Sequence, residues 1–172
     1  MTKEDIKARL IQNDALFNNI YVVEQQFDIV PDDRMHYGAA ITYQDLMELR
    51  SGFLEQLVDT VVDWVYSSEK YTDLKARFMA SGKSEGAAVS QIARKAKEKF
   101  RRGDDNLLIQ GQLGELLLFH FIQRFKNAVP LLRKMPITTS AEHERYGADA
   151  IHYKIEDGKN IIVLGEAKAY TS

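Results

Sequence analysis

The sequence has no cysteine, only three prolines, a single tryptophan and no long apolar run. Without cysteine the chain forms neither disulfide bonds nor thiolate metal sites, and a reducing cytoplasm is the expected compartment. No apolar stretch approaches the roughly 20 residues that cross a membrane, and the opening MTKEDIKARL lacks the character of a signal peptide. The formal net charge is only −2, so a nucleic-acid partner would be bound by a local basic patch rather than by overall charge.

At 172 residues and 45% hydrophobic content, the chain is long enough to bury a proper core in one or two domains. The pattern of the sequence predicts an α+β protein. A mainly helical region over residues 1–103 is expected to precede a domain built from one helix and a small mixed sheet over residues 104–172. The polar stretch RRGDDN is the expected boundary.

Apolar spacings of three and four residues predict helices at residues 3–12, 42–66, 70–80, 85–102 and 106–126. In the second of these helices, Leu46, Leu49 and Phe53 would begin the buried side. Strands are predicted at 20–29 and at 131–139, where Pro136 implies an edge or a bulge. From residue 106 onward the expected order is therefore helix, strand, strand, strand.

The stretch GADAIHYKIEDGKNIIVLGEAK, residues 147–168, alternates apolar and polar residues around Asp157-Gly158. That dipeptide favours a two-residue type I′ turn, so paired residues have numbers that sum to 315, and Asp149 lies opposite Glu166. Alternation puts both carboxylates and Lys168 on one face of the hairpin. We expect this face to be apolar and turned to the core except at its open end, with His152 on the opposite face.

Facing Cβ atoms in a sheet lie about 4.5–5.5 Å apart, so the two carboxylates would repel each other and favour a bound cation. The alternative is that charges near strand ends are simply solvated. The 106–126 helix bears on this choice. Its Gly111 and Gly114 predict a close approach to a neighbouring helix or a ligand, and Glu115 begins an apolar stripe. Packed across the apolar hairpin face, this helix would bring Glu115 to the same end as Asp149.

A helix bearing Glu, an Asp in the second strand as GAD, and Glu-x-Lys in the third as GEAK resemble the core of PD-(D/E)XK nucleases. More narrowly, GQLGELLLFHF, ERYGADAIHY and VLGEAK resemble the HamA nuclease subunits of Hachiman anti-phage defence systems and the related AbpA proteins. The resemblance covers roughly residues 106–172. One departure is that Ala148 stands where the name-giving proline of the superfamily would be.

The resemblance implies a metal-dependent endonuclease that cleaves DNA together with a helicase partner. Asp149 and Glu166 would bind Mg²⁺ or Mn²⁺, with the Ala167 carbonyl as a further ligand. Lys168 would orient or activate the attacking water, and Glu115 would bind the metal through water or help to place a second one. Two alternatives stay open: a catalytically inactive module that binds DNA or the helicase, and a cation with a purely structural role.

The PD-(D/E)XK core continues after Glu-x-Lys with another helix and strand, which this sequence lacks. We therefore expect either that the chain is a fragment of a longer protein or that a second subunit covers the sheet. The candidates for that cover are the helicase and a second copy of the chain, which would make a homo-oligomer.

The stretch QIARKAKEKFRR, residues 91–102, carries six cations and one acid. It predicts either a helix face that binds DNA phosphates or an ordinary solvated face. The polar loop before Asp149 is either a DNA contact or a simple connector. The candidate nucleic-acid contacts are Arg94, Lys95, Lys97, Lys99, Arg101, Arg102 and Arg145.

Overall fold

The computed structural model describes residues 2–11, 13–26, 35–100, 106–132, 148–168 and 170. The chain is an α+β protein, as its sequence predicts. It divides into two compact units, a small unit of residues 13–59 and a large unit of residues 1–12 with 60–172. The predicted boundary at 103 lies outside the described residues.

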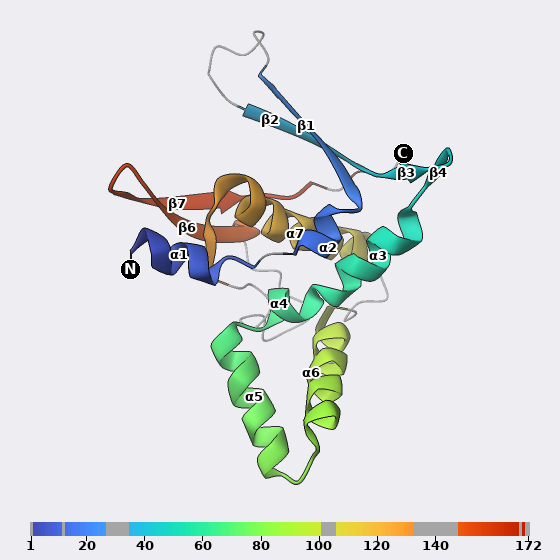
Figure 1. Cartoon of the computed structure of the whole chain (residues 1–172), viewed down its shortest axis with the longest axis vertical. Helices are drawn as coiled ribbons and strands as arrows, with labels where there is room; N and C mark the ends of the chain where they lie inside the picture. The colour runs from blue at the N-terminus through green and yellow to red at the C-terminus, as the bar shows by residue number, and fades with distance from the viewer. Residues whose placement is uncertain are drawn as a thin grey trace. The chain divides into compact units, whose positions relative to one another are not determined.

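The small unit contains two short antiparallel hairpins and two helices (Figure 1). Its elements are α2 (Asp14–Phe17), β1 (Ile20–Gln26), β2 (Met35–Ile41), β3 (Tyr43–Gln44), β4 (Met47–Glu48) and α3 (Arg50–Asp59). Leu16, Phe53 and Leu57 are buried.

The predicted 42–66 helix is wrong in its first turns. The chain reverses at Asp45 and Leu46, which both have positive φ, and β3 pairs with β4. Leu46 is 97% exposed rather than buried, because it lies at the turn of a hairpin. The helix begins only at Arg50, and Thr60 separates it from the next helix.

The large unit consists of a helical part and a three-stranded sheet covered by one long helix (Figure 1). Its elements are α1 (Lys3–Arg9), α4 (Val61–Val65), α5 (Ser68–Ala80), α6 (Glu85–Phe100), α7 (Asn106–Lys126), β5 (Val129–Leu132), β6 (Ala150–Glu156) and β7 (Lys159–Gly165). These helices confirm the predictions for residues 3–12, 70–80, 85–102 and 106–126 within a few residues at their ends.

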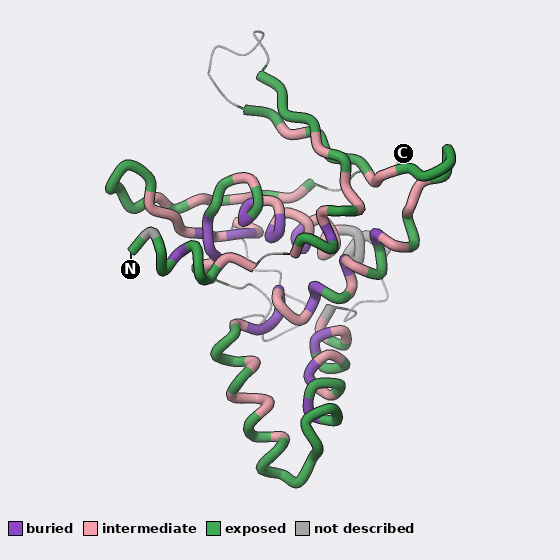
Figure 2. Tube along the Cα trace, viewed as in Figure 1, coloured by how far each residue is buried: buried purple, intermediate pink, exposed green. Residues whose placement is uncertain are grey.

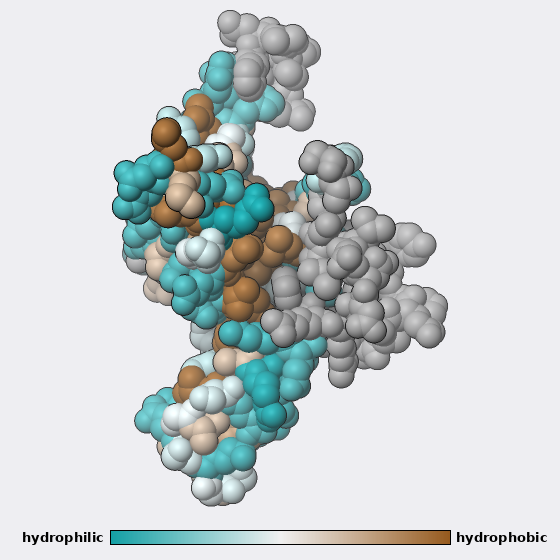
Figure 3. All heavy atoms as spheres, turned by 90° about the vertical axis from the view of Figure 1, so that its right-hand side faces the viewer, coloured by the Kyte–Doolittle hydropathy of each residue, from teal (hydrophilic) through white to brown (hydrophobic). Residues whose placement is uncertain are grey.

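The helices α5 and α6 pack side by side, and α6 has a narrow buried stripe. Ala88, Ile92 and Ala96 form the buried stripe of α6, and Figure 2 shows buried residues along the side of α6 turned to α5. The part of the surface that these two helices occupy, at the bottom of Figure 3, is mainly hydrophilic to neutral. The pair is a helical hairpin with a narrow apolar seam.

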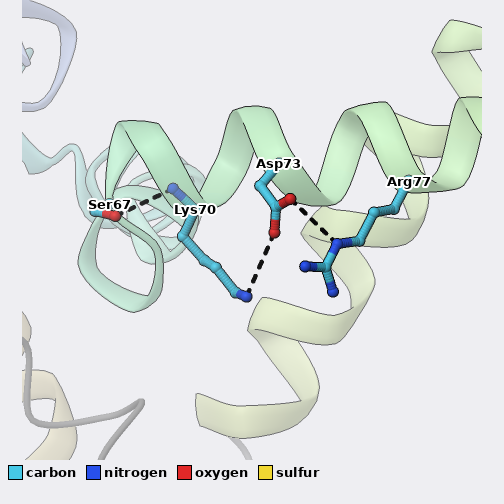
Figure 4. Close-up of polar contacts among 4 residues, drawn as sticks. All are labelled: Ser67, Lys70, Asp73 and Arg77. Carbon is cyan, nitrogen blue, oxygen red and sulfur yellow. Dashed lines mark hydrogen bonds and ion pairs between the residues drawn. The ribbon is translucent and has the colours of Figure 1, made fainter.

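Polar contacts hold α5 in place along its exposed side (Figure 4). The hydroxyl of Ser67 caps the helix by accepting a hydrogen bond from the backbone N–H of Lys70 at 3.2 Å. Asp73 lies between two cations, 3.6 Å from Nζ of Lys70 and 3.1 Å from Nε of Arg77. Lys75 also pairs with Glu85 at the start of α6. Each basic side chain of α5 is therefore paired with an acidic side chain of α5 or α6.

The sheet has the order β5-β6-β7, and its pairs are antiparallel. Asp157 (φ 49°) and Gly158 (φ 73°) form the predicted turn. The pairs run from Glu156 with Lys159 to Ala150 with Gly165, so the predicted register is confirmed. The described part of the predicted 131–139 strand belongs to β5, whereas residues 133–139, including Pro136, lie outside the described residues.

The face of the hairpin that packs on α7 is the opposite of the predicted one. Ala150 and His152 are buried against the helix, whereas Ile162 and Leu164 are 60% and 67% exposed. Both faces of the hairpin are apolar, so alternation alone did not identify the covered one. The helix packs on the face with the smallest residues, Ala150 and Gly165, where it can approach the strands most closely.

No helix in the described part of the chain is long and apolar enough to cross a membrane.

Candidate functional site

The open end of the β6–β7 hairpin brings the GAD and GEAK motifs together. Ala150 and Gly165 form the last pair of the ladder, so Asp149 and Glu166 are the next residue outward on each side. The backbone N–H of Ala167 donates a hydrogen bond to Oδ2 of Asp149 at 2.9 Å. This bond closes the end of the hairpin and fixes the half-buried Asp149 carboxylate beside the GEAK backbone.

Glu166 and Lys168 form the exposed part of the site. Their side chains are paired with each other, and 64% and 65% of their surfaces are accessible. The hydrogen bond from Lys168 to Glu166 raises the pKa of the Lys168 ammonium, and the negative charges of Glu166 and then Asp149 raise it further. Lys168 therefore keeps its proton at neutral pH and acts as a hydrogen-bond donor and a positive charge.

The helix α7 reaches the same end of the hairpin. A Cβ placed on Gly114 would lie 3.4 Å from Cβ of Ala167, so the predicted close approach at Gly114 is confirmed. At Gly111 no described residue lies within 4 Å of such a Cβ, so no neighbouring helix of the described part approaches closely there, and the ligand alternative stays a prediction. Glu115 follows Gly114 and is only 9% exposed.

Gly165, the first residue of GEAK, has a structural role that the sequence did not reveal. A Cβ at this position would lie 2.7 Å from Cδ1 of Ile122 and 3.0 Å from Cδ2 of Leu118. Glycine therefore lets β7 lie directly against α7 and sets the height of Glu166 and Lys168 relative to the helix. The only signal in the sequence was a glycine in an otherwise β-branched strand, which is typical of a close backbone approach.

Two histidines fill the core behind the site. The imidazoles of His120 on α7 and His152 on β6 are 1% and 0% exposed, and the ring of Phe119 lies 5.1 Å from one and 5.5 Å from the other. Burial, and then the nearby His152, lower the pKa of His120 to about 4. The His120 ring is therefore neutral at physiological pH, and His152 lies on the face opposite the carboxylates, as predicted.

The arrangement of acidic groups limits what the described residues form by themselves. Among them, no group of three or more His, Asp or Glu side chains is placed to hold a metal ion. Asp149 and Glu166 each have a partner in the hairpin, Ala167 N–H and Lys168 respectively. The groups available at the open end are thus the carboxylates of Asp149 and Glu166, the ammonium of Lys168 and the neighbouring backbone.

The basic stretch of α6 is divided between two sides of the helix. Nζ of Lys95 lies 5.2 Å from the centre of the Phe78 ring, and Nζ of Lys99 lies 5.5 Å from that of Tyr66. At 100° per residue, Arg94 and Lys97 fall on the other side of the helix, where Arg94 lies 3.9 Å from Glu98. Arg101, Arg102 and Arg145 lie outside the described residues.

A family model decides the affiliation. The model of the HamA family matches residues 14–172. The chain belongs to the HamA family. HamA is the nuclease-like subunit of Hachiman defence, so membership gives this chain a role in anti-phage defence. The comparisons with curated proteins and with solved structures found no match. The HamA match covers both units except residues 1–13, includes the whole of the candidate site, and confirms the resemblance to HamA seen in GQLGELLLFHF, ERYGADAIHY and VLGEAK.

Proposed function

We propose that this HamA-family chain is a Mg²⁺- or Mn²⁺-dependent nuclease of the PD-(D/E)XK type, which hydrolyses DNA phosphodiester bonds as the effector of a defence complex with a helicase. The observation that carries the proposal is the open end of the hairpin. Its register places Asp149 and Glu166 on adjacent strand ends, with Lys168 beside them. Two carboxylates and an ammonium gathered at one end are groups that bind a divalent cation and a phosphate.

The donor set fits a hard divalent cation. The carboxylates of Asp149 and Glu166 and the Ala167 carbonyl are oxygen donors, which Mg²⁺ prefers, and Mg²⁺ commonly binds through one or two carboxylates while keeping several waters. Oδ2 of Asp149 is already oriented by Ala167 N–H, so part of the ligand geometry is preorganised. When bound, the cation would polarise a phosphodiester oxygen and lower the pKa of the attacking water.

The protein's own residues would position the scissile phosphate. The Lys168 ammonium, whose pKa is raised, is a donor for a phosphate oxygen and would stabilise the negative charge that develops on it. As an ammonium beside the reacting phosphate, Lys168 would orient the attacking water and stabilise the developing charge. Glu115 is buried on α7, which packs on the face of the hairpin opposite the Glu166 and Lys168 side chains, so it would reach the cation only through water.

DNA would be bound by a basic surface on α6 and not by the carboxylates at the open end of the hairpin. The side of α6 that carries Arg94 and Lys97 offers cations to phosphates, whereas Lys95 and Lys99 lie over aromatic rings. Only part of the basic stretch would then contribute to the salt dependence of binding. The opposing proposal is an inactive module that binds DNA or the helicase, and it predicts binding without cleavage.

The deciding experiment is a cleavage assay with the purified chain, alone and with its helicase, on plasmid and on linear duplex DNA. Wild type should cleave in Mg²⁺ or Mn²⁺ and stop in EDTA. Asp149→Asn and Lys168→Ala should each lose cleavage by roughly 100-fold or more, as the removal of one transition-state contact does. Lys159→Ala, which alters an exposed cation at the other end of β7, is the matched control and should cleave like wild type.

DNA affinity in EDTA, measured by fluorescence anisotropy, separates chemistry from binding. Lys168→Ala should bind DNA nearly as tightly as wild type, because the residue acts on the reacting phosphate. A Lys168→Ala variant that cleaves at the wild-type rate would refute the nuclease assignment, and DNA binding without any cleavage by wild type would support the inactive module.

A further inference from the structure

The tip of the β3–β4 hairpin, residues 43–48, has a strained turn. Asp45 and Leu46 have φ values of 51° and 65°, which is the pattern of a two-residue type I′ turn. The left-handed conformation is unfavourable for leucine because its Cβ crowds the following carbonyl. The β6–β7 hairpin makes the same kind of turn with Asp157 followed by Gly158, whose φ is 73°, so the chain uses glycine for this position elsewhere.

The tip exposes large apolar side chains. Leu46, Met47 and Tyr43 are 97%, 73% and 66% exposed, and Figure 2 shows the β3–β4 segment as largely exposed. Tyr43 pairs with Glu48 and Met47 pairs with Gln44, so the tyrosine and the methionine point to opposite faces of the hairpin. The β3–β4 tip therefore carries one large exposed apolar side chain on each face and one at its end, an arrangement that a pocket on another protein would enclose.

The charges beside these apolar residues indicate which charge a complementary pocket would have at its rim. Asp45 lies in the turn, and Glu48 lies at the base, where Arg50 pairs with it at 3.1 Å. The net charge of the β3–β4 tip with Arg50 is negative, which disfavours DNA phosphates and anionic membranes. A second copy is also a poor fit, because two tips would bring their carboxylates together. A second copy does offer a cavity of about 180 Å³ between α4 and α5. Asp63 lines this cavity, so it would repel the negatively charged tip.

We propose that the β3–β4 tip is a docking anchor that inserts Leu46, Met47 and Tyr43 into an apolar pocket, rimmed by lysine or arginine, on a partner protein. The helicase subunit is the partner to test, and this choice rests on the proposed function. This proposal explains the strained conformation of Leu46, because its side chain would serve the contact with the partner and not the stability of the fold. Buried apolar anchors of this kind dominate the affinity of protein interfaces.

The test measures the affinity of the purified chain for the purified helicase subunit by biolayer interferometry. Leu46→Gly should weaken binding roughly 10- to 100-fold, because a leucine side chain leaves the pocket. The same variant should melt at or above the wild-type temperature, because glycine relieves the turn. Met47→Gln should also weaken binding at least tenfold. Met79→Ser removes an apolar side chain that is 44% exposed on α5, and this control should bind like wild type.

Each other result contradicts the proposal. The β3–β4 tip is not the anchor if Leu46→Gly binds the helicase as tightly as wild type, or if wild type does not bind it. A dimer that Leu46→Gly dissociates would identify a second copy as the occupant, and binding to phosphatidylcholine vesicles that Leu46→Gly abolishes would identify a membrane. The Lys168→Ala variant separates the two proposals, because it should bind the helicase as tightly as wild type does. If wild type binds the helicase through the β3–β4 tip but never cleaves DNA, only the nuclease proposal fails.

Discussion

Gly165 offers a direct test of how α7 and β7 are packed beneath the candidate site. A Cβ at this position would lie 2.7 Å from Ile122 Cδ1 and 3.0 Å from Leu118 Cδ2. These atoms are the ends of side chains, so they are able to rotate away, and Gly165→Ala should lower the free energy of unfolding by only about 1 kcal/mol. Gly165→Val needs more space and should cost about 3 kcal/mol, the upper range for overpacking a core.

Trp64 makes the measurement possible. It is the single tryptophan, is 3% exposed, and belongs to the same large unit as α7 and β7, so its fluorescence in a urea titration reports the unfolding of that unit. Gly111→Ala is the matched control. Its Cβ would meet no described residue within 4 Å, and the substitution should stabilise the helix by up to about 1 kcal/mol. If Gly165→Val is as stable as wild type, the packing described for this end of the hairpin is wrong.

Two further predictions concern pH and DNA. Because burial and then His152 lower the pKa of folded His120 from 6.5 to about 4, the unfolded chain binds more protons between those values. The free energy of unfolding should therefore fall by up to roughly 3 kcal/mol as the pH drops through this window, and His120→Gln should flatten that fall in urea titrations. Reversing the charges of Arg94 and Lys97 should weaken DNA binding and reduce its slope against log[salt] by about two phosphate contacts. Lys95→Gln should change that slope less, because its ammonium lies over Phe78, and equal slopes in all three proteins would contradict this division of α6.

The sequence predicted the hairpin register well because two independent local signals agreed. Asp157-Gly158 specified the turn, and the alternation on both sides specified the strands, so the register up to the pair of Ala150 with Gly165 was predicted correctly without tertiary information. Which face is covered depends on where α7 packs. The helix packs on the face that carries the small residues Ala150 and Gly165. This preference depends on the contact between the helix and the sheet, so the pattern of the hairpin alone does not reveal it.

The error at residues 42–49 has a different cause. Leu46, Leu49 and Phe53 follow the spacing of a helix, and no glycine or asparagine marks the turn. The structure forms the turn at Asp45 and Leu46 all the same. At the site, the order of Glu115, Asp149 and Glu-x-Lys was visible in the sequence. The hydrogen bond from Ala167 to Asp149 and the pairing of Glu166 with Lys168 were not visible, because they depend on side-chain positions at the end of the ladder.

The central claim is that the open end of the β6–β7 hairpin binds a divalent cation. The most direct measurement is the anomalous difference density of Mn²⁺ in crystals of the wild-type chain and of Asp149→Asn. The account predicts a peak coordinated by the carboxylates of Asp149 and Glu166 in wild type and none there in Asp149→Asn, with Glu166 turned from Lys168 toward the ion. Wild-type crystals at millimolar Mn²⁺ with no peak between these carboxylates would contradict the claim.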